Sequence, residues 1–181
     1  MQPKGAAQPK GTMDVHDERT TLTFRRVYRH RIEDVWAAIT TPEGLRAWLM
    51  ATDVTLEARA GGRIEMTSGP ARFRSTGRIL ACEPPRVFEY EWQVAPVPEM
   101  PDGERAVVRY ELREEAGATH VVVVYRGLTL RTSRGFLPGL HAMLDRLEAQ
   151  LDGTAQPAFG ERFEELLREY PEWSHAAAAG E

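Results

Sequence analysis

The feature that most constrains the fold is a change in hydrophobic periodicity along the chain. From residue 54 to residue 127, apolar side chains recur at every second position in several short runs. In the run RVFEYEW, Phe88, Tyr90 and Trp92 alternate with two glutamates. Alternation with a period of two is typical of strands that bury one face and expose the other. These runs, separated by turn-forming residues, predict an antiparallel meander of about six strands.

The leucines beyond Gly127 have a helical period instead. They recur at steps of three and four, and Gly153 follows the last of them as a residue suited to end a helix. The stripe is formed by Leu137, Leu140, Leu144, Leu147 and Leu151. One long amphipathic helix is therefore available to cover the apolar face of the sheet.

Two long runs, AVVRYELRE and THVVVVYRGL, are predicted to pair as a hairpin. The four consecutive valines hide their own alternation, so the ends of the run set its register. Val121, Val123 and Tyr125 are expected to face inward, and Arg126 outward.

Before the meander, the segment TLTFRRVYRH predicts one further strand, with Leu22, Phe24 and Val27 as its inward residues. The order of elements indicates an α+β protein. It would have a curved antiparallel sheet of roughly six to seven strands around a long C-terminal helix, and two short helices after the first strand. Such a sheet is wider than one helix, so a gap is expected between them at one end.

Two short helical patterns, residues 32–40 and 42–49, follow the first strand. Thr41 is suited to cap the second of them, and Pro42 to occupy its first position. Trp36 and Trp48 lie on the two helices. We expect a bent helical pair that anchors on the sheet edge through these aromatic side chains and roofs the gap.

Four segments are predicted along the chain. Residues 1–19, rich in Pro, Gly, Gln and Lys without periodicity, are expected to form a flexible tail, and residues 20–153 the sheet-and-helix domain. Residues 154–171 add an amphipathic helix that either packs on its own domain, which we favour, or forms the contact of a homodimer. Residues 172–181 are expected to be a second flexible tail.

Composition argues against two classes of partner, nucleic acids and membranes. The net charge of −4, without a basic cluster, argues against nucleic-acid binding. No apolar run approaches the roughly 20 residues of a membrane span, and the N-terminus lacks the apolar core of a signal peptide, so we expect a cytoplasmic protein.

A search for catalytic and metal-binding motifs is negative. The single cysteine, Cys82, can form neither an internal disulfide nor a Cys-pair zinc site, and is expected to be a buried, inert thiol. The five histidines are far apart in sequence, and no common nucleotide, hydrolase or zinc motif occurs. No metal and no cofactor are predicted.

Two motifs carry a resemblance to a known family. The chain pairs VYRHRIEDVWAAIT and TPEGLRAWL with CEPPRVFEYEW further on. Together these resemble the homologues of the activator of heat-shock-protein-90 ATPase, in the START-like (SRPBCC) superfamily of helix-grip proteins. The resemblance covers residues 20–153, although Gly135-Phe136 stands where the family usually has Gly-Trp, and residues 158–170 are an addition.

The resemblance implies a cavity for an apolar small molecule, such as a lipid, a polyketide or an aromatic compound, between the sheet and the long helix. It also raises a contact with a chaperone. The chaperone contact is disfavoured, because the eukaryotic activator has a second domain with an Asn-rich motif and this chain contains no Asn.

The inward positions supply the candidate ligand-binding residues. These are Trp48, Ile64, Met66, Phe73, Phe88, Tyr90, Trp92, Tyr110, Tyr125 and His141. The three tyrosines fall on three strands, where they either orient the polar end of a guest or serve as core residues with backbone partners. His141 lies on the margin of the leucine stripe, where it either points into the cavity or flanks the stripe in contact with solvent.

Two functions of different classes fit these expectations, and a third is weaker. The protein is a carrier or sensor of an apolar molecule, or it is an enzyme that uses the same cavity with His141 or a tyrosine as acid or base. The third function is a chaperone- or regulator-binding module. Because no paired acid and base is visible in the sequence, we favour the carrier, with no catalytic residue assigned.

Overall fold

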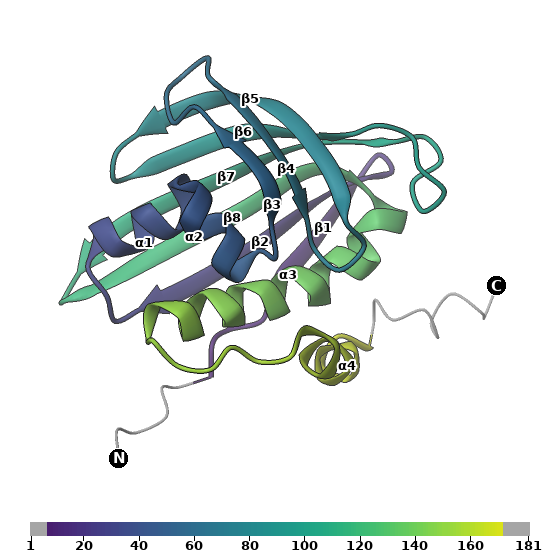
Figure 1. Cartoon of the computed structure of the whole chain (residues 1–181). Coiled ribbons are helices and arrows are strands. Elements are labelled where there is room, and N and C mark those ends of the chain that lie inside the picture. The colour runs from purple at the N-terminus through teal and green to yellow at the C-terminus, as the bar shows by residue number, and fades with distance from the viewer. Residues whose placement is uncertain (1–6, 172–181) are drawn as a thin grey trace.

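The computed structural model describes residues 7–171, which form one curved, eight-stranded antiparallel sheet and four helices (Figure 1). The strands are β1 (Thr12–His16), β2 (Arg19–Tyr28), β3 (Thr52–Leu56), β4 (Arg63–Ser68), β5 (Phe73–Glu83), β6 (Val87–Val94), β7 (Glu104–Glu115) and β8 (Ala118–Thr129). The helices are α1 (Ile32–Thr40), α2 (Pro42–Trp48), α3 (Leu130–Leu151) and α4 (Phe159–Glu169). The predicted α+β helix-grip fold is confirmed, with eight strands in place of six to seven.

The order of strands across the sheet is β1-β2-β8-β7-β6-β5-β4-β3. The strands from β3 to β8 form the predicted meander, whereas β2 pairs with the last strand, β8. The ladders change register at three places, between Thr20 and Thr21, between Thr52 and Thr55, and between Ile79 and Ala81. Irregularities of this kind bend and twist strands. The resulting concave face holds α3 (Figure 1).

The first strand, β1, corrects the prediction of a flexible tail over residues 1–19. It pairs with β2, from Thr12 opposite Thr23 to His16 opposite Arg19. Four of its five side chains are exposed, so the strand has no alternating apolar pattern in the sequence. The predicted tail over residues 172–181, like residues 1–6, lies outside the described part of the chain.

The inward face of β2 differs from the prediction at one position. Leu22, Phe24 and Tyr28 are buried as alternation requires. The inward residue between the last two is Arg26, which is 1% exposed, whereas Val27 is 41% exposed. The prediction for Val27 is therefore wrong. Arg26 has an ion-pair partner on α3, which allows a charged side chain to be buried.

The two short helices form the predicted bent pair. The Thr41 hydroxyl accepts a hydrogen bond from the Gly44 amide at 3.1 Å, and Pro42 occupies the first helical position. Trp48 is buried, and its indole nitrogen donates to the Ala38 carbonyl at 3.0 Å. Gly44 permits this close approach, because a Cβ atom there would lie 2.5 Å from the Ala38 carbonyl oxygen.

The long helix α3 lies across the concave face, and α4 packs on α3 (Figure 1). α3 begins before the predicted stripe, because the Thr129 hydroxyl caps it by accepting from the Thr132 amide at 3.3 Å. Gly153 follows its end with a φ of 65°. Leu166 of α4 is fully buried, so the additional helix packs on its own domain. Within residues 7–171, no helix combines the length and apolar character of a membrane span.

Candidate functional site

A cavity of about 330 Å³ lies on the concave face, bounded by the sheet, α3, α4 and the turn between β4 and β5. The predicted residues that line it are Met66, Phe73, Tyr90, Trp92 and Tyr125. They come from four strands and have in common that they face inward. The alternating pattern of the sequence therefore indicated the sheet side of this cavity.

Other predicted residues belong to the packed core instead. Trp48, Ile64, Phe88 and Tyr110 are buried but are not part of the cavity lining. Phe88 makes an edge contact with Trp36 at a centroid distance of 6.1 Å, which fills the space beside α1. The expectation that the two tryptophan-bearing helices roof the cavity holds only for Leu49, the C-cap residue of α2, which lines it; neither Trp36 nor Trp48 does.

The roof is made by residues that the sequence analysis did not assign. Phe136 of α3 packs edge-on against Trp92 at 5.3 Å, and Phe159 stacks on Phe163 of α4 at 5.7 Å. Gly139 of α3 faces the α4 rings, and a Cβ atom there would lie at ordinary contact distances, 3.8 Å from Phe163 and 3.9 Å from Phe159. The only sequence signal for the α4 side of this roof was the apolar face of residues 158–170. Periodicity could not show which surface that face contacts.

The lining is apolar apart from a few hydroxyl groups. Among the described residues, its polar side chains are Ser68, Tyr90 and Tyr125, and none of the lining side chains is charged. Burial raises the pKa of Tyr90 well above its usual value and that of Tyr125 to about 12. Both phenols are therefore neutral donors at physiological pH. The cavity suits a neutral apolar molecule and lacks a strong base.

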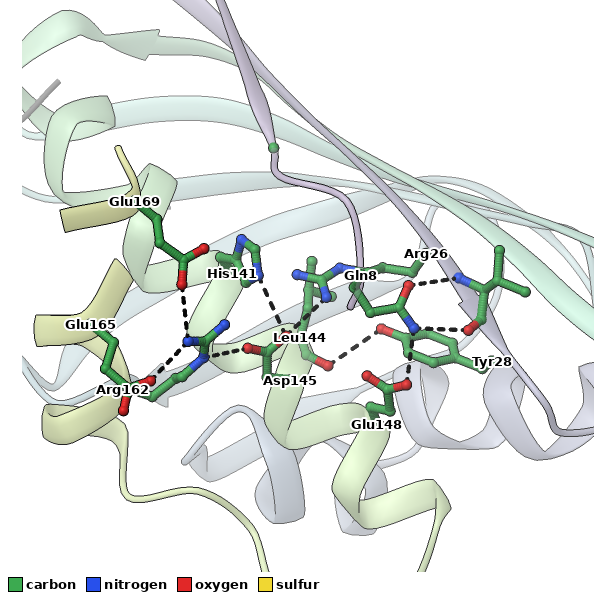
Figure 2. Close-up of polar contacts among 12 residues, drawn as sticks. Gln8, Arg26, Tyr28, His141, Leu144, Asp145, Glu148, Arg162, Glu165 and Glu169 are labelled. Atoms are coloured by element: carbon green, nitrogen blue, oxygen red, sulfur yellow. Dashed lines mark hydrogen bonds and ion pairs between the residues drawn. The ribbon is translucent and has the colours of Figure 1, made fainter. Parts of the chain in front are cut away.

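His141 lies outside the cavity, contrary to both expectations for it. Its ring is 2% exposed, so it neither lines the cavity nor contacts solvent. Its Nδ1 shares a hydrogen bond with the Tyr170 hydroxyl at 2.8 Å. Its Nε2 lies 3.6 Å from a carboxylate oxygen of Asp145 (Figure 2). Burial, and then the nearby Arg26 charge, lower the pKa of His141 to about 4. The imidazole is therefore neutral at physiological pH.

The surroundings of His141 attach α4 to the rest of the domain. We call Arg26, His141, Asp145, Arg162 and Tyr170 the α4 clamp. Asp145 is its centre: one oxygen accepts from Arg26 at 2.9 Å and the other from Arg162 of α4 at 2.8 Å (Figure 2). Within residues 7–171, two further nitrogens of the buried Arg26 guanidinium, Nε and Nη2, have no hydrogen-bond partner. The clamp has contacts of a structural kind, and none of its five residues lines the cavity described above.

The N-terminal segment joins this clamp. The Gly11 amide donates to the Tyr170 hydroxyl at 2.7 Å, and the Lys10 ammonium group donates to the main chain of Glu169. The Gln8 amide side chain bonds to the main chain of Val27 (Figure 2). Residues close to the two ends of the described chain are thus fastened to each other.

A second hollow, of about 560 Å³, lies near the loop between β6 and β7. It is lined by polar residues that include Arg19, Glu104 and Thr129. The buried Glu104 carboxylate accepts from the Thr129 amide at 3.2 Å and from its hydroxyl at 2.8 Å. Glu104 therefore fixes the start of α3.

Metal and thiol chemistry have little support here. No group of three or more His, Cys, Asp or Glu side chains suited to a metal ion is found in the described part of the chain. The Cys82 thiol is partly buried, donates to the Ala58 carbonyl at 3.4 Å, and has a pKa raised by burial. A raised pKa disfavours the nucleophilic thiolate.

Fold and cavity together define the class of protein: a helix-grip domain with an aromatic-lined cavity between its sheet and its long helix. Within that class, the chain belongs to the family described as activator of Hsp90 ATPase homolog 1-like protein, whose sequence profile matches residues 29–152. The match includes α1, α2 and α3, and leaves β1, β2 and α4 outside. Members of the family bind hydrophobic ligands.

Solved structures of the same fold come from several bacteria. Protein MLL2253 from Mesorhizobium loti is 27% identical, with a TM-score of 0.65, over 75% of this chain and 98% of that one. CalU16 from Micromonospora echinospora is 21% identical, with a TM-score of 0.69, over 94% of this chain and 99% of that one. EF2215 from Enterococcus faecalis, a conserved protein of unknown function, is 14% identical over 92% of this chain and 93% of that one, with a TM-score of 0.67. No curated protein matches the chain.

Proposed function

We propose that the protein binds a neutral, apolar small molecule in the cavity between the sheet, α3 and α4, and that it acts as a carrier or sensor. The observation that carries this proposal is a cavity of about 330 Å³ whose lining is aromatic and aliphatic and has no charged side chain among the described residues. Such concave, largely apolar spaces with a few polar groups are the usual form of small-molecule sites. Family membership alone allows either a ligand or a chaperone-type partner, and the cavity favours the ligand.

A carrier fits the chemistry of the cavity better than an enzyme does. The imidazole considered as an acid or base, His141, is buried in the α4 clamp and does not line the cavity. The phenols that do line it, Tyr90 and Tyr125, hold their protons firmly because burial raises their pKa values. Efficient acid-base catalysis requires a group whose pKa lies near the working pH.

Burial of the guest would supply the affinity. Removing about 200 to 300 Å² of apolar ligand surface from water contributes roughly 5 to 8 kcal/mol. That range corresponds to dissociation constants between about 0.2 millimolar and about one micromolar. A neutral bicyclic or tricyclic compound is therefore expected to bind measurably.

Native mass spectrometry of freshly purified protein and a titration with the neutral dye N-phenyl-1-naphthylamine test this proposal. The variant Leu140→Trp places a larger side chain in the lining and should weaken dye binding at least tenfold. Leu151→Trp is the matched control, because Leu151 lies on the same helix, is also partly buried, and does not line the cavity. Equal dye affinity in both variants would show that the ligand site is elsewhere.

A further inference from the structure

The cavity has a buried floor and a partly exposed rim. The side chains at the floor, such as Tyr90, Trp92 and Met143, are buried. The lining residues of the rim are partly buried or exposed, and include Pro70 and Ala71 in the turn between β4 and β5, Phe136 and Leu140 of α3, and Phe159 and Phe163 of α4. α4 therefore stands at the side of the cavity where solvent reaches the lining.

One face of α4 is divided between the cavity and the α4 clamp. Four side chains recur at steps of four, three and four residues, which places them on the same face of the helix. They are Phe159, Phe163, Leu166 and Tyr170. The first two line the cavity, whereas the last two are buried outside its lining. The first half of α4 thus covers the cavity, and the second half fastens the helix.

Apolar packing holds α4 less firmly than α3. Leu166 is the one buried residue within α4, whereas α3 buries a stripe along most of its length. The segment that joins the two helices, residues 152–158, is exposed over its first four residues, and Gly153 in it has a φ of 65°. The family's sequence profile ends at residue 152, so α4 lies outside the part of the chain that the family shares.

The position of α4 depends instead on polar contacts with α3 and with the N-terminal segment. Arg162 donates to Asp145 of α3 at 2.8 Å (Figure 2). At the end of the helix, the Tyr170 hydroxyl bonds to His141 of α3 at 2.8 Å and accepts from the Gly11 amide at 2.7 Å. Bonds to water replace such contacts when they open, so the net contribution of each is small. A helix held in this way can separate locally while the rest of the domain stays folded.

We infer that α4 is a lid of the cavity, which swings outward on residues 152–158 and is held closed by the α4 clamp and by Gly11. Outward movement takes Phe159 and Phe163 away from the cavity and widens its opening. Loss of one clamp contact should therefore speed the entry and the exit of a guest alike. The affinity should stay the same, because the clamp residues do not line the cavity. This inference rests on the proposed function, since it describes how the same cavity opens.

Stopped-flow fluorescence with the dye N-phenyl-1-naphthylamine tests the inference. Tyr170→Phe removes the hydroxyl but keeps the ring, so both rate constants should rise about five- to tenfold while the dissociation constant changes less than twofold. Arg162→Met breaks the contact with Asp145 and provides a second clamp variant if the first does not fold. Tyr28→Phe is the matched control, because Tyr28 is a buried tyrosine outside both the α4 clamp and the cavity lining, and it should leave both rates unchanged. Thermal melting checks that each variant is folded.

A thiol placed in the cavity reports the opening without a ligand. In the background Cys82→Ser, which removes the single native cysteine, Met143→Cys puts a thiol on a buried residue of the lining. Its reaction with N-ethylmaleimide should be about five- to tenfold faster when Tyr170→Phe or Arg162→Met is added. Addition of Tyr28→Phe should leave the reaction rate unchanged.

The outcomes separate this inference from the proposed function. Unchanged dye rates, or an unchanged maleimide reaction, in the folded clamp variants would overturn the lid and leave the apolar cavity intact. A weaker dye affinity with an unchanged entry rate would overturn it too, because α4 would then be a fixed wall. Equal acceleration in Tyr28→Phe would show a general loosening of the domain and would also overturn it. Failure of the dye to bind the unmodified protein would refute the proposed function, and the maleimide reaction alone would then decide whether α4 opens.

Discussion

The buried ion pair between Arg26 and Asp145 predicts an unequal response to mutation of its two members. The Arg26 side chain is fully buried, and its ion-pair partner among the described residues is Asp145, at 2.9 Å. Asp145→Ala would leave the guanidinium charge buried without a counter-ion. Removing one member of a buried pair typically costs about 3 to 5 kcal/mol, and we expect a loss in this range.

Substitution of the other member of the pair, Arg26, should cost less stability. Arg26→Met leaves Asp145 partly exposed and still paired with Arg162 at 2.8 Å, so the expected loss is about 2 kcal/mol. The double variant Arg26→Met/Asp145→Leu removes both charges and fills the space with apolar atoms. It should regain most of the stability lost in Asp145→Ala, because buried pairs are often replaced by apolar residues at little cost.

Urea unfolding followed by tryptophan fluorescence gives these free energies, provided that the transitions are two-state. The informative quantity is the coupling between the two substitutions in the double-mutant cycle. A loss of less than about 1 kcal/mol in Asp145→Ala would refute the reasoning. A double variant as unstable as Asp145→Ala would refute it equally.

Three further predictions concern pH, helix contact and a buried indole. The folded-state pKa of His141, about 4, lies below the ordinary 6.5, so the unfolded chain binds the proton first as the pH falls. The free energy of unfolding, measured by urea titration, should therefore drop by roughly 3 kcal/mol between pH 6.5 and pH 4. An equally steep dependence of this free energy on pH in His141→Gln would contradict the prediction. Gly44→Ala should lower the thermal midpoint, because the new Cβ atom would meet the Ala38 carbonyl oxygen at 2.5 Å. Gly160→Ala in α4 is the control: the space around Gly160 is open, so this substitution should leave the midpoint unchanged or raise it. Trp48→Phe, which loses the hydrogen bond of the indole to Ala38, should cost about 1 kcal/mol or more in urea unfolding, and a neutral result would show that this bond contributes nothing.

The parts of the fold that were predictable are those in which one local pattern determines the outcome. Alternation in β6 and β8 identified the buried residues, and setting the register of the valine run from its ends correctly placed Val121, Val123 and Tyr125 inward. The Thr41-Pro42 sequence correctly located the start of α2. Each of these predictions depends on the period of the element or on a cap within a few residues.

The errors occur where the outcome depends on a partner far away in the chain. Placing Val27 inward assumed that an arginine faces water, but Arg26 finds a carboxylate on α3, 119 residues later. β1 is held by main-chain pairing with β2, which leaves no apolar pattern to detect. A charge pair of this kind and an edge strand are both tertiary features.

The candidate site also has one part that a local pattern predicts and another that depends on a distant partner. Its sheet side, with Tyr90, Trp92 and Tyr125, followed from alternation, whereas its roof depends on where α4 docks. The apolar stripe of α3 did not indicate that α4 packs on its other side. His141 was therefore expected either to point into the cavity or to contact solvent, whereas it faces Tyr170. A periodicity argument locates a face but does not identify what covers it.

One consequence follows from the contact between the two ends of the described chain. Gly11 and Lys10 hold the end of the helix whose first turns carry Phe159 and Phe163. If a guest leaves past those two rings, α4 has to shift, and this junction would oppose the shift. Its residence time would then be governed by amino acids that it never touches, so trimming the chain ahead of β1 should accelerate release while leaving the shape of the binding space unaltered.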